Sequence, residues 1–134
     1  MPKKVPKAVV LATHNGNALL MRITKQGVLR LGWRLPRWVK RDPRSTWEWN
    51  IVGYFKCDLN LDVRRERLRH IKEVMVGKKK RVFFAIDLTE DEADLMRIGQ
   101  VREGIETRLV HVEDLDHMDD FGDREQELLL ALKN

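Results

Sequence analysis

The stretch from Leu35 to Cys57, LPRWVKRDPRSTWEWNIVGYFKC, is rich in basic side chains that could bind phosphate. Its candidate phosphate-binding residues are Arg37, Lys40, Arg41, Arg44 and Lys56. Arginine can form two parallel hydrogen bonds with phosphate oxygens, and lysine supplies a compact positive charge. The alternative is that these charges point into solvent and bind nothing.

The same part of the chain holds all four tryptophans, Trp33, Trp38, Trp47 and Trp49. Indole rings interleaved with basic residues can stack on nucleobases, and they can equally anchor a protein interface. Trp33 and Trp38 are the candidates for either role, and we expect Trp38 to be exposed because it lies in a loop. A place in the core is expected for Trp47 or Trp49, which belong to a helix.

Acidic residues that could bind a metal are few in this region. Between Arg44 and Leu61 the only acids are Glu48 and Asp58. The four histidines, His14, His70, His111 and His117, have no metal-ligand spacing. We therefore expect no metal and no cofactor at this site.

A later acidic pair, Glu103 and Glu106, is a possible remnant of a metal site. Two acids alone make a poor cation site, so we expect a surface loop in which they pair with Arg102 and Arg108. The single cysteine, Cys57, excludes an internal disulfide and favours a reducing, cytoplasmic setting.

Hydrophobic periodicity and turn residues predict the elements that position these side chains. Strands are expected at 7–13 and 18–23, joined by a tight turn at 14–17, with an extended piece at 28–35. A loop at 37–44 leads to a helix from Ser45 to about Leu59, opened by a Ser45–Glu48 capping box. Within it, Gly53 suggests close packing.

The second half of the chain predicts a hairpin, two further helices and another strand. Its strands are expected at 71–76, 81–88 and 108–112, and its helices at 89–99, 114–118 and 124–133, the first of them opened by a Thr89–Glu92 capping box. The order of elements indicates an α+β fold, an α/β/α sandwich whose mixed sheet is flanked by helices. We expect one domain over 1–134, with 1–6 as a flexible basic tail.

Composition sets limits on the partners. The 134 residues carry a net charge of +5, with 43% hydrophobic and 35% charged residues. A basic balance favours polyanions such as nucleotides, RNA or acidic protein faces. No apolar run approaches the roughly 18 residues that a membrane span needs, so no membrane contact is expected.

The frame resembles a Nudix hydrolase domain along nearly its whole length. Trp33-Arg34-Leu35-Pro36 fits the W-x-L-P turn of that family, and Phe84 to Thr89, followed by acids, fits its F-x-a-x-l-t segment. Glu103, Glu106 and Arg108 fit its late E-x-x-E-x-R, and Val110 to Leu115 fits the segment after it. The resemblance implies the Nudix fold.

The family's catalytic motif, G-x5-E-x7-R-E-U-x-E-E-x-G-U, is not kept. Counted from the Leu-Pro turn, its conserved positions fall at Trp38, Arg44, Val52, Gly53, Lys56, Cys57 and Leu59, and only the apolar position, at Tyr54, is retained. The family's glutamates bind Mg²⁺ or Mn²⁺ against a diphosphate, and hard cations need such oxygen ligands. The resemblance therefore implies the fold and argues against the reaction.

Three hypotheses follow. The favoured one is a catalytically degenerate Nudix-fold protein that binds a phosphate-bearing ligand, a nucleotide or RNA, through a basic former active-site cleft. The second is a protein-interaction or structural subunit that uses the tryptophan-rich segment 33–49. The third is a residual nucleoside diphosphate hydrolase that uses Mg²⁺ with Glu103, Glu106 and, as an option, Glu48.

Overall fold

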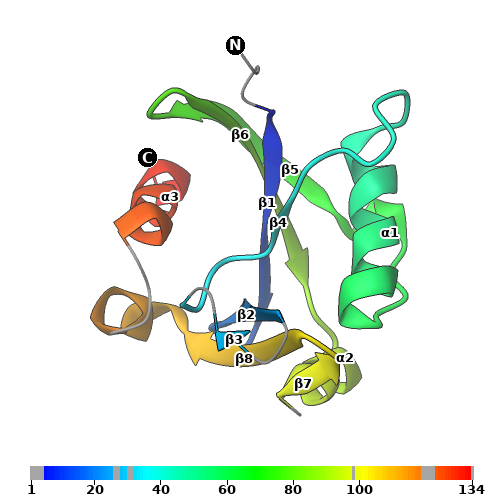
Figure 1. Ribbon diagram of the computed structural model, residues 1–134, viewed down its shortest axis with the longest axis vertical. Helices are drawn as coiled ribbons and strands as arrows, with labels where there is room; N and C mark the ends of the chain where they lie inside the picture. The colour runs from blue at the N-terminus through cyan, green and yellow to red at the C-terminus, as the bar shows by residue number, and fades with distance from the viewer. Residues whose placement is uncertain (1–4, 26–27, 30–31, 98, 119–122, 134) are drawn as a thin grey trace.

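A mixed β-sheet with helices on both faces forms the framework of the protein (Figure 1). The computed structural model describes residues 5–25, 28–29, 32–97, 99–118 and 123–133. Their strands are β1 (Lys7–His14), β2 (Asn17–Lys25), β3 (Val28–Leu29), β4 (Arg37–Trp38), β5 (Arg69–Val76), β6 (Lys79–Asp87), β7 (Gln100–Arg102) and β8 (Ile105–His111). Their helices are α1 (Trp47–Leu59), η1 (Arg65–Arg67), α2 (Glu90–Met96), η2 (Val112–His117) and α3 (Asp123–Lys133). This arrangement confirms the predicted fold class.

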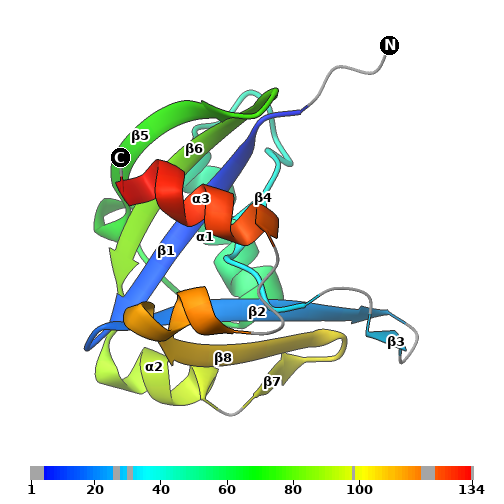
Figure 2. The same ribbon diagram turned by 90° about the vertical axis from the view of Figure 1, so that its left-hand side faces the viewer.

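The sheet runs in the order β5-β6-β1-β2-β8-β7, with β4 beside β1 and β3 beside β2. Strands β1 and β6 pair in parallel along their length. Strands β1 and β2 pair only next to their hairpin, at Thr13↔Ala18 and His14↔Asn17, and then separate. The sheet therefore opens into two arms, one with β1 and β6 and the other with β2 and β8 (Figure 2).

Helices α1 and α3 lie on opposite sides of the arm that contains β1 and β6 (Figure 1). Alternate residues of β1 serve two separate apolar clusters, as the period of two in a strand requires. Val10 packs with Phe55 of α1, whereas Val9 packs with Leu128 of α3. Both faces of this arm are thus buried, and each helix has its own apolar contact surface.

The β1–β2 hairpin has the predicted turn. Asn15 and Gly16 both have positive φ angles, of 50° and 80°, as a tight turn with this sequence favours. The predicted β5–β6 hairpin and the terminal helix α3 are also confirmed.

The start of α1 differs from the prediction. Thr46, not Ser45, is the N-cap, and its hydroxyl accepts a hydrogen bond from the Trp49 amide. The Ser45 hydroxyl instead donates to the Asp42 carboxylate at 2.9 Å. The predicted Ser45–Glu48 capping box is therefore wrong, because a local turn around Asp42 uses the serine first.

Three further expectations need correction. The segment 37–44 is not all loop, because β4 pairs with β1 through Ala8↔Trp38 and Val9↔Arg37. Gly53 does not mark close packing, since no atom lies within 4 Å of where its Cβ would be. The extended piece at 28–35 is described only in part: β3 and an Arg34–Met21 bridge are present, and 30–31 lie outside the described residues.

The region after β6 differs in its boundaries. Helix α2 ends at Met96, before the predicted end at Gly99, and strand β7 was not predicted. Of the predicted basic tail, 1–4 lie outside the described residues, and β1 begins at Lys7.

The predicted Thr89–Glu92 capping box is present and extends into an ion pair. The Glu92 carboxylate accepts hydrogen bonds from the Thr89 amide and from both terminal nitrogens of Arg67, at 2.7 and 2.8 Å. The Arg67 guanidinium also donates to the carbonyl oxygen of Asp87. The contact between Glu92 and Arg67 therefore links α2 to η1, and Arg67 in turn links η1 to the end of β6.

We predict that Glu92→Gln lowers the free energy of unfolding by about 1–2 kcal/mol at pH 7. The hydrogen bond with Arg67 holds the pKa of Glu92 below its ordinary value of 4.5. Stability from a lowered carboxyl pKa is present above the ordinary value and is lost as pH falls through the lowered one. The difference between the two proteins, measured by urea unfolding, should therefore shrink below pH 4.5. Glu103→Gln, at an exposed position, is the control and should change little.

Candidate functional site

A buried carboxylate on α3 holds the turn that leads from the sheet to α1. Glu125 is 4% exposed, and its oxygens accept hydrogen bonds from the Leu35 amide at 2.9 Å and from the Arg37 guanidinium at 2.5 Å. On the other side of the turn, the Pro36 carbonyl accepts from the Val10 amide. The Leu-Pro turn is thus fixed between β1 and α3, and it delivers Arg37 to the α3 side of the sheet.

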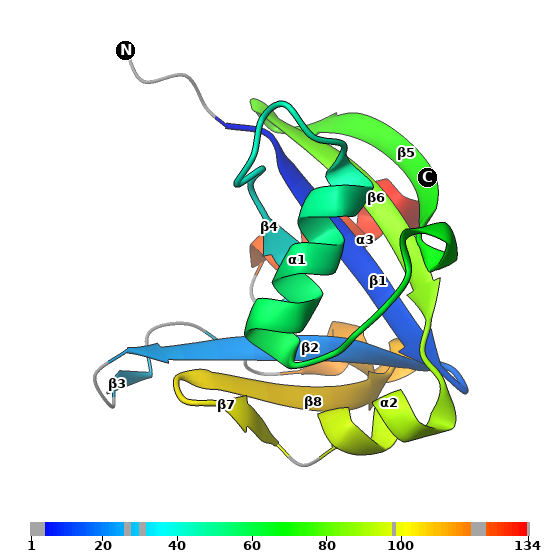
Figure 3. The same ribbon diagram turned by 90° about the vertical axis from the view of Figure 1, so that its right-hand side faces the viewer.

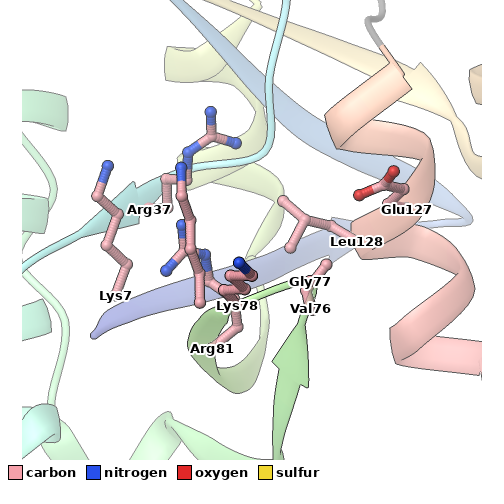
Figure 4. A pocket seen from close by; sticks show the side chains of 9 residues that line it. Lys7, Arg37, Val76, Gly77, Lys78, Arg81, Glu127 and Leu128 are labelled. Carbon is pink, nitrogen blue, oxygen red and sulfur yellow. The ribbon is translucent and has the colours of Figure 1, made fainter. Parts of the chain in front are cut away.

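Arg37 lines a cavity of about 210 Å³, here named the basic pocket. The lining residues are Lys7, Arg37, Val76, Gly77, Lys78, Lys79, Arg81, Glu127 and Leu128. Figure 4 shows the side chains of Lys7, Arg37, Lys78 and Arg81 gathered at one side, with Leu128 and Glu127 facing them from α3. The start of β1, β4, the β5–β6 turn and α3 therefore all contribute to one cavity.

Burial, together with repulsion among cations, disfavours the charged forms of two basic residues at the basic pocket. Burial lowers the pKa of Lys7, and the positive charges of Arg37, Arg81, Arg34 and Lys79 lower it further. Burial and the charge of Arg37 likewise lower the pKa of Arg34, against a raising effect of Glu125. Within the described residues, the buried Nε of Arg34 has no hydrogen-bond partner. The pocket thus has an excess of positive charge, and an anion bound there would relieve it.

The structure places Arg37 apart from the other four predicted phosphate-binding residues. Lys40 lies over the Trp47 ring at 5.2 Å, and Arg41 lies over the Tyr54 ring at 4.9 Å, both on the side of α1. Arg44 and Lys56 are exposed, before and within α1. The predicted set is therefore divided between the two faces of the sheet.

The expectation that Trp38 is exposed is wrong. Trp38 is 8% exposed, its Nε1 donates to Asp58 at 2.9 Å, and its ring stacks on Tyr54. The reason is strand pairing: Trp38 lies opposite Ala8, whose side chain belongs to the α1 cluster. The Trp38 indole therefore lies in the same apolar cluster as Ala8.

The other tryptophans also divide between core and surface. Trp33 is 8% exposed, with the Arg22 guanidinium 4.4 Å from its ring centroid. Trp47 is partly buried against the α1 cluster, as a core position requires. Trp49 is 50% exposed, so the indole open to solvent is on the helix and not in the loop.

Of the two late acids, Glu106 lies in β8 and pairs with Arg22 on β2, at 3.0 Å, not with Arg102 or Arg108 as predicted. Cross-strand register sets this partner, since Arg22 is directly opposite Glu106. Glu103 is exposed between β7 and β8. In the described part of the chain, no three His, Cys, Asp or Glu side chains are grouped to hold a metal ion.

The residues on the α1 side do not fit the divalent cation that the Nudix resemblance implies. Gly53, Lys56 and Cys57 stand at three of the motif's acidic positions. The pKa of Arg41 is raised above its ordinary value, first by a side-chain hydrogen bond with Cys57 and then by nearby Tyr54. A guanidinium thus lies beside these positions, where a hard cation would need several oxygen ligands.

Three residues of the basic pocket and its support were missed by sequence reasoning. Lys7 reads as the first residue of a strand, Arg34 as part of the Leu-Pro turn, and Glu125 as a surface acid of an amphipathic helix. Only the pairing of β4 with β1 and the docking of α3 bring them together. Among the described helices, none is both long and apolar enough to cross a membrane.

Comparison with known proteins identifies the fold. No family model and no curated protein matches the chain. Among solved structures, a MutT protein, from work on the Aliivibrio salmonicida and Vibrio cholerae enzymes, aligns at TM-score 0.63 and 12% identity, over 96% of this chain and 99% of that one. The Nudix domain of Shewanella oneidensis NrtR, complexed with ADP ribose, aligns at 0.65 and 10%, over 99% and 89%.

Two further solved structures are similar over most of their length. An ADP compounds hydrolase aligns at TM-score 0.67 and 15% identity, covering 98% of this chain and 72% of that one. The C-terminal domain of mouse MUTYH, in complex with human PCNA, aligns at 0.65 and 12%, over 98% and 88%. The chain has the Nudix fold, as the sequence resemblance predicts.

We predict that Glu125→Gln lowers the free energy of unfolding by about 3 kcal/mol, because it leaves Arg37 and Arg34 buried without their counter-charge. Chemical unfolding at pH 7 measures the effect. Glu103→Gln, at an exposed position outside the basic pocket, is the control and should stay within about 0.5 kcal/mol of the unchanged protein. Equal effects at the two positions would contradict the role given to Glu125.

Proposed function

We propose that this protein binds a phosphate-bearing ligand in the basic pocket and does not hydrolyse it. The observation that carries the proposal is the convergence of Lys7, Arg37 and Lys78, with Arg81 beneath them, on one cavity. Like charges brought together in this way destabilise the free protein. A bound phosphate converts that repulsion into attraction, since charge-assisted hydrogen bonds to phosphate are among the strongest in proteins.

The size of the basic pocket suggests which part of a ligand it takes. Its volume of about 210 Å³ is below the roughly 300–1,000 Å³ of cavities that enclose a drug-sized molecule. A phosphate or diphosphate group fits inside, and the rest of the ligand extends outside. Val76 and Leu128 provide an apolar wall for whatever carbon lies next to the phosphates.

The similar solved structures favour a nucleoside diphosphate derivative as the first ligand to test. One of them contains ADP ribose, and another is described as an ADP compounds hydrolase. Hydrolysis is not part of the proposal, because the α1 face carries Gly53, Lys56 and Cys57 where the motif of such enzymes has acids. Arg37 and Lys78 would hold the phosphates directly, without a bridging metal.

We expect ADP ribose and ADP to raise the melting temperature, with EDTA present as well as with Mg²⁺. At a hundred times the dissociation constant, a ligand adds about 2.7 kcal/mol to the stability of the folded state. Lys78→Glu, at the exposed β5–β6 turn, should weaken binding at least about tenfold. Arg102→Glu makes the same charge change at an exposed residue of β7 and should bind as before.

Two results would overturn the proposal. A shift that requires Mg²⁺, accompanied by release of nucleoside monophosphate, would point to the enzyme and to Glu103, Glu106 and Glu48. No shift with any phosphate compound would leave the protein-interaction hypothesis, and the search would turn to a protein partner.

A second prediction concerns the stability of the ligand-free protein. Because the pKa of Lys7 is lowered, charging it is unfavourable in the folded state. This penalty is fully present below the lowered pKa and disappears as pH rises to the ordinary value of 10.5. Lys7→Met should therefore raise the melting temperature at pH 7 while weakening ADP binding, and its advantage should vanish above pH 10.5. Arg102→Met, which also removes one positive charge, should leave the melting temperature nearly unchanged.

A further inference from the structure

The outer face of α1 carries an exposed indole with open space beside it. Trp49 is 50% exposed, whereas Trp33 and Trp38 are 8% exposed. One helical turn further on, Gly53 has no atom within 4 Å of where its Cβ would be. Residues four apart lie on the same face of a helix. The glycine therefore leaves a hollow next to the indole ring.

Two adjoining hollows meet at Trp49 and Gly53, and together they form what is here named the α1 groove. The larger, of about 800 Å³, is also lined by Val52, Val63, Arg64, Arg65 and Glu66. The smaller, of about 70 Å³, is also lined by Arg41, Asn50 and Tyr54. Figure 3 shows α1 from this side, with the chain that follows it turning back towards η1. The exposed ring thus has arginines at both ends of the groove.

The arginines of the α1 groove are available to a ligand. In the part of the chain that the structure describes, neither Arg64 nor Arg65 forms an ion pair with a carboxylate, and both are exposed. Arg41 is exposed as well, and its guanidinium lies over the Tyr54 ring at the other end. Glu66 is the acid among the lining residues.

We propose that the α1 groove binds single-stranded nucleic acid, with a base stacked on Trp49 and neighbouring phosphates on Arg41, Arg64 and Arg65. An open aromatic ring between cations matches the alternation of bases and phosphates along a single strand. A duplex would not fit this chemistry, because its base faces are hidden in the stack. Tryptophan and arginine are also enriched at protein interfaces, so a protein partner is the alternative occupant, and absence of oligonucleotide binding would favour it.

This site is separate from the basic pocket. The basic pocket lies on the α3 side of the β1–β6 arm, and the α1 groove lies on the opposite side, against α1. The two share no lining residue. Each can therefore be removed by substitution without changing the other.

The test is fluorescence anisotropy with a labelled single-stranded oligonucleotide of about ten nucleotides, a length within the range of known single-strand sites. Trp49→Ala should weaken binding about tenfold or more, and Trp49→Phe, which keeps a stacking ring, should retain most of it. Arg64→Glu combined with Arg65→Glu should weaken binding and flatten its salt dependence by about 0.7 in log–log slope per lost phosphate contact.

Two controls separate this site from general attraction to a basic surface and from the basic pocket. Arg102→Glu reverses the charge of one exposed arginine on β7 and should leave oligonucleotide binding unchanged. Lys78→Glu should reduce ADP binding but not oligonucleotide binding, so the two proposals can fail independently.

Three results would overturn the inference. The first is equal affinity of Trp49→Ala and the unchanged protein for the single strand. The second is equal or tighter binding of a duplex of the same length. The third is absence of binding at about 100 μM oligonucleotide and moderate salt, a range in which even non-specific complexes form.

Discussion

The contact between Glu125 and the Leu-Pro turn determines where Arg37 lies. It brings a buried carboxylate from near the end of the chain to the backbone of Leu35 and to the side chain of Arg37. Without that contact, Arg37 would lose the buried carboxylate to which it donates a hydrogen bond on the α3 side. The turn also sets the start of β4 and therefore the approach to α1. One carboxylate thus couples the α3 side of the sheet to the segment that precedes α1.

A single carboxylate is not enough for the cations around it. Glu125 accepts from Arg37 and partly offsets Arg34, but the pKa of Lys7 is still lowered, first by burial and then by four neighbouring positive charges. Selection for stability alone favours replacing one of these residues, because repulsion inside a partly buried cluster lowers the stability of the free protein. The arrangement is what an anion-binding pocket requires: the unfavourable energy of the free state is released when the ligand supplies the missing negative charge.

Local sequence rules predicted those elements whose causes are local. The Asn15–Gly16 turn, the Thr89–Glu92 capping box and the β5–β6 hairpin each depend on residues a few positions apart, and each is present. The predicted N-cap of α1, Ser45, is one residue away from the observed one, because the nearby Asp42 carboxylate accepts a hydrogen bond from the Ser45 hydroxyl. Such competition between two valid local partners cannot be decided from residue types alone.

The candidate site was predicted less well, because its geometry depends on long-range pairing. The sequence groups Arg37 with Arg41, four residues later, yet β4 pairing and Glu125 direct Arg37 to α3 while Arg41 packs on Tyr54. The same pairing buries Trp38 opposite Ala8 and leaves Trp49 exposed. Lys7 and Lys78 are far apart in the sequence and meet only through the β1–β6 register.

The α1 face lacks the acids of the Nudix motif, and this limits the chemistry that it can perform. Where the related motif has glutamates, this helix has Gly53, Lys56 and Cys57, and the Arg41 guanidinium lies over the ring of Tyr54, on the same helix. A fixed cation cannot activate water as a metal ion does, but it can still attract phosphate. Gly53 adds open space on the same face of the helix as the exposed ring of Trp49. In the binding mode proposed for the α1 groove, this face holds bases and single phosphates at the place where the Nudix motif would hold a metal ion and a diphosphate.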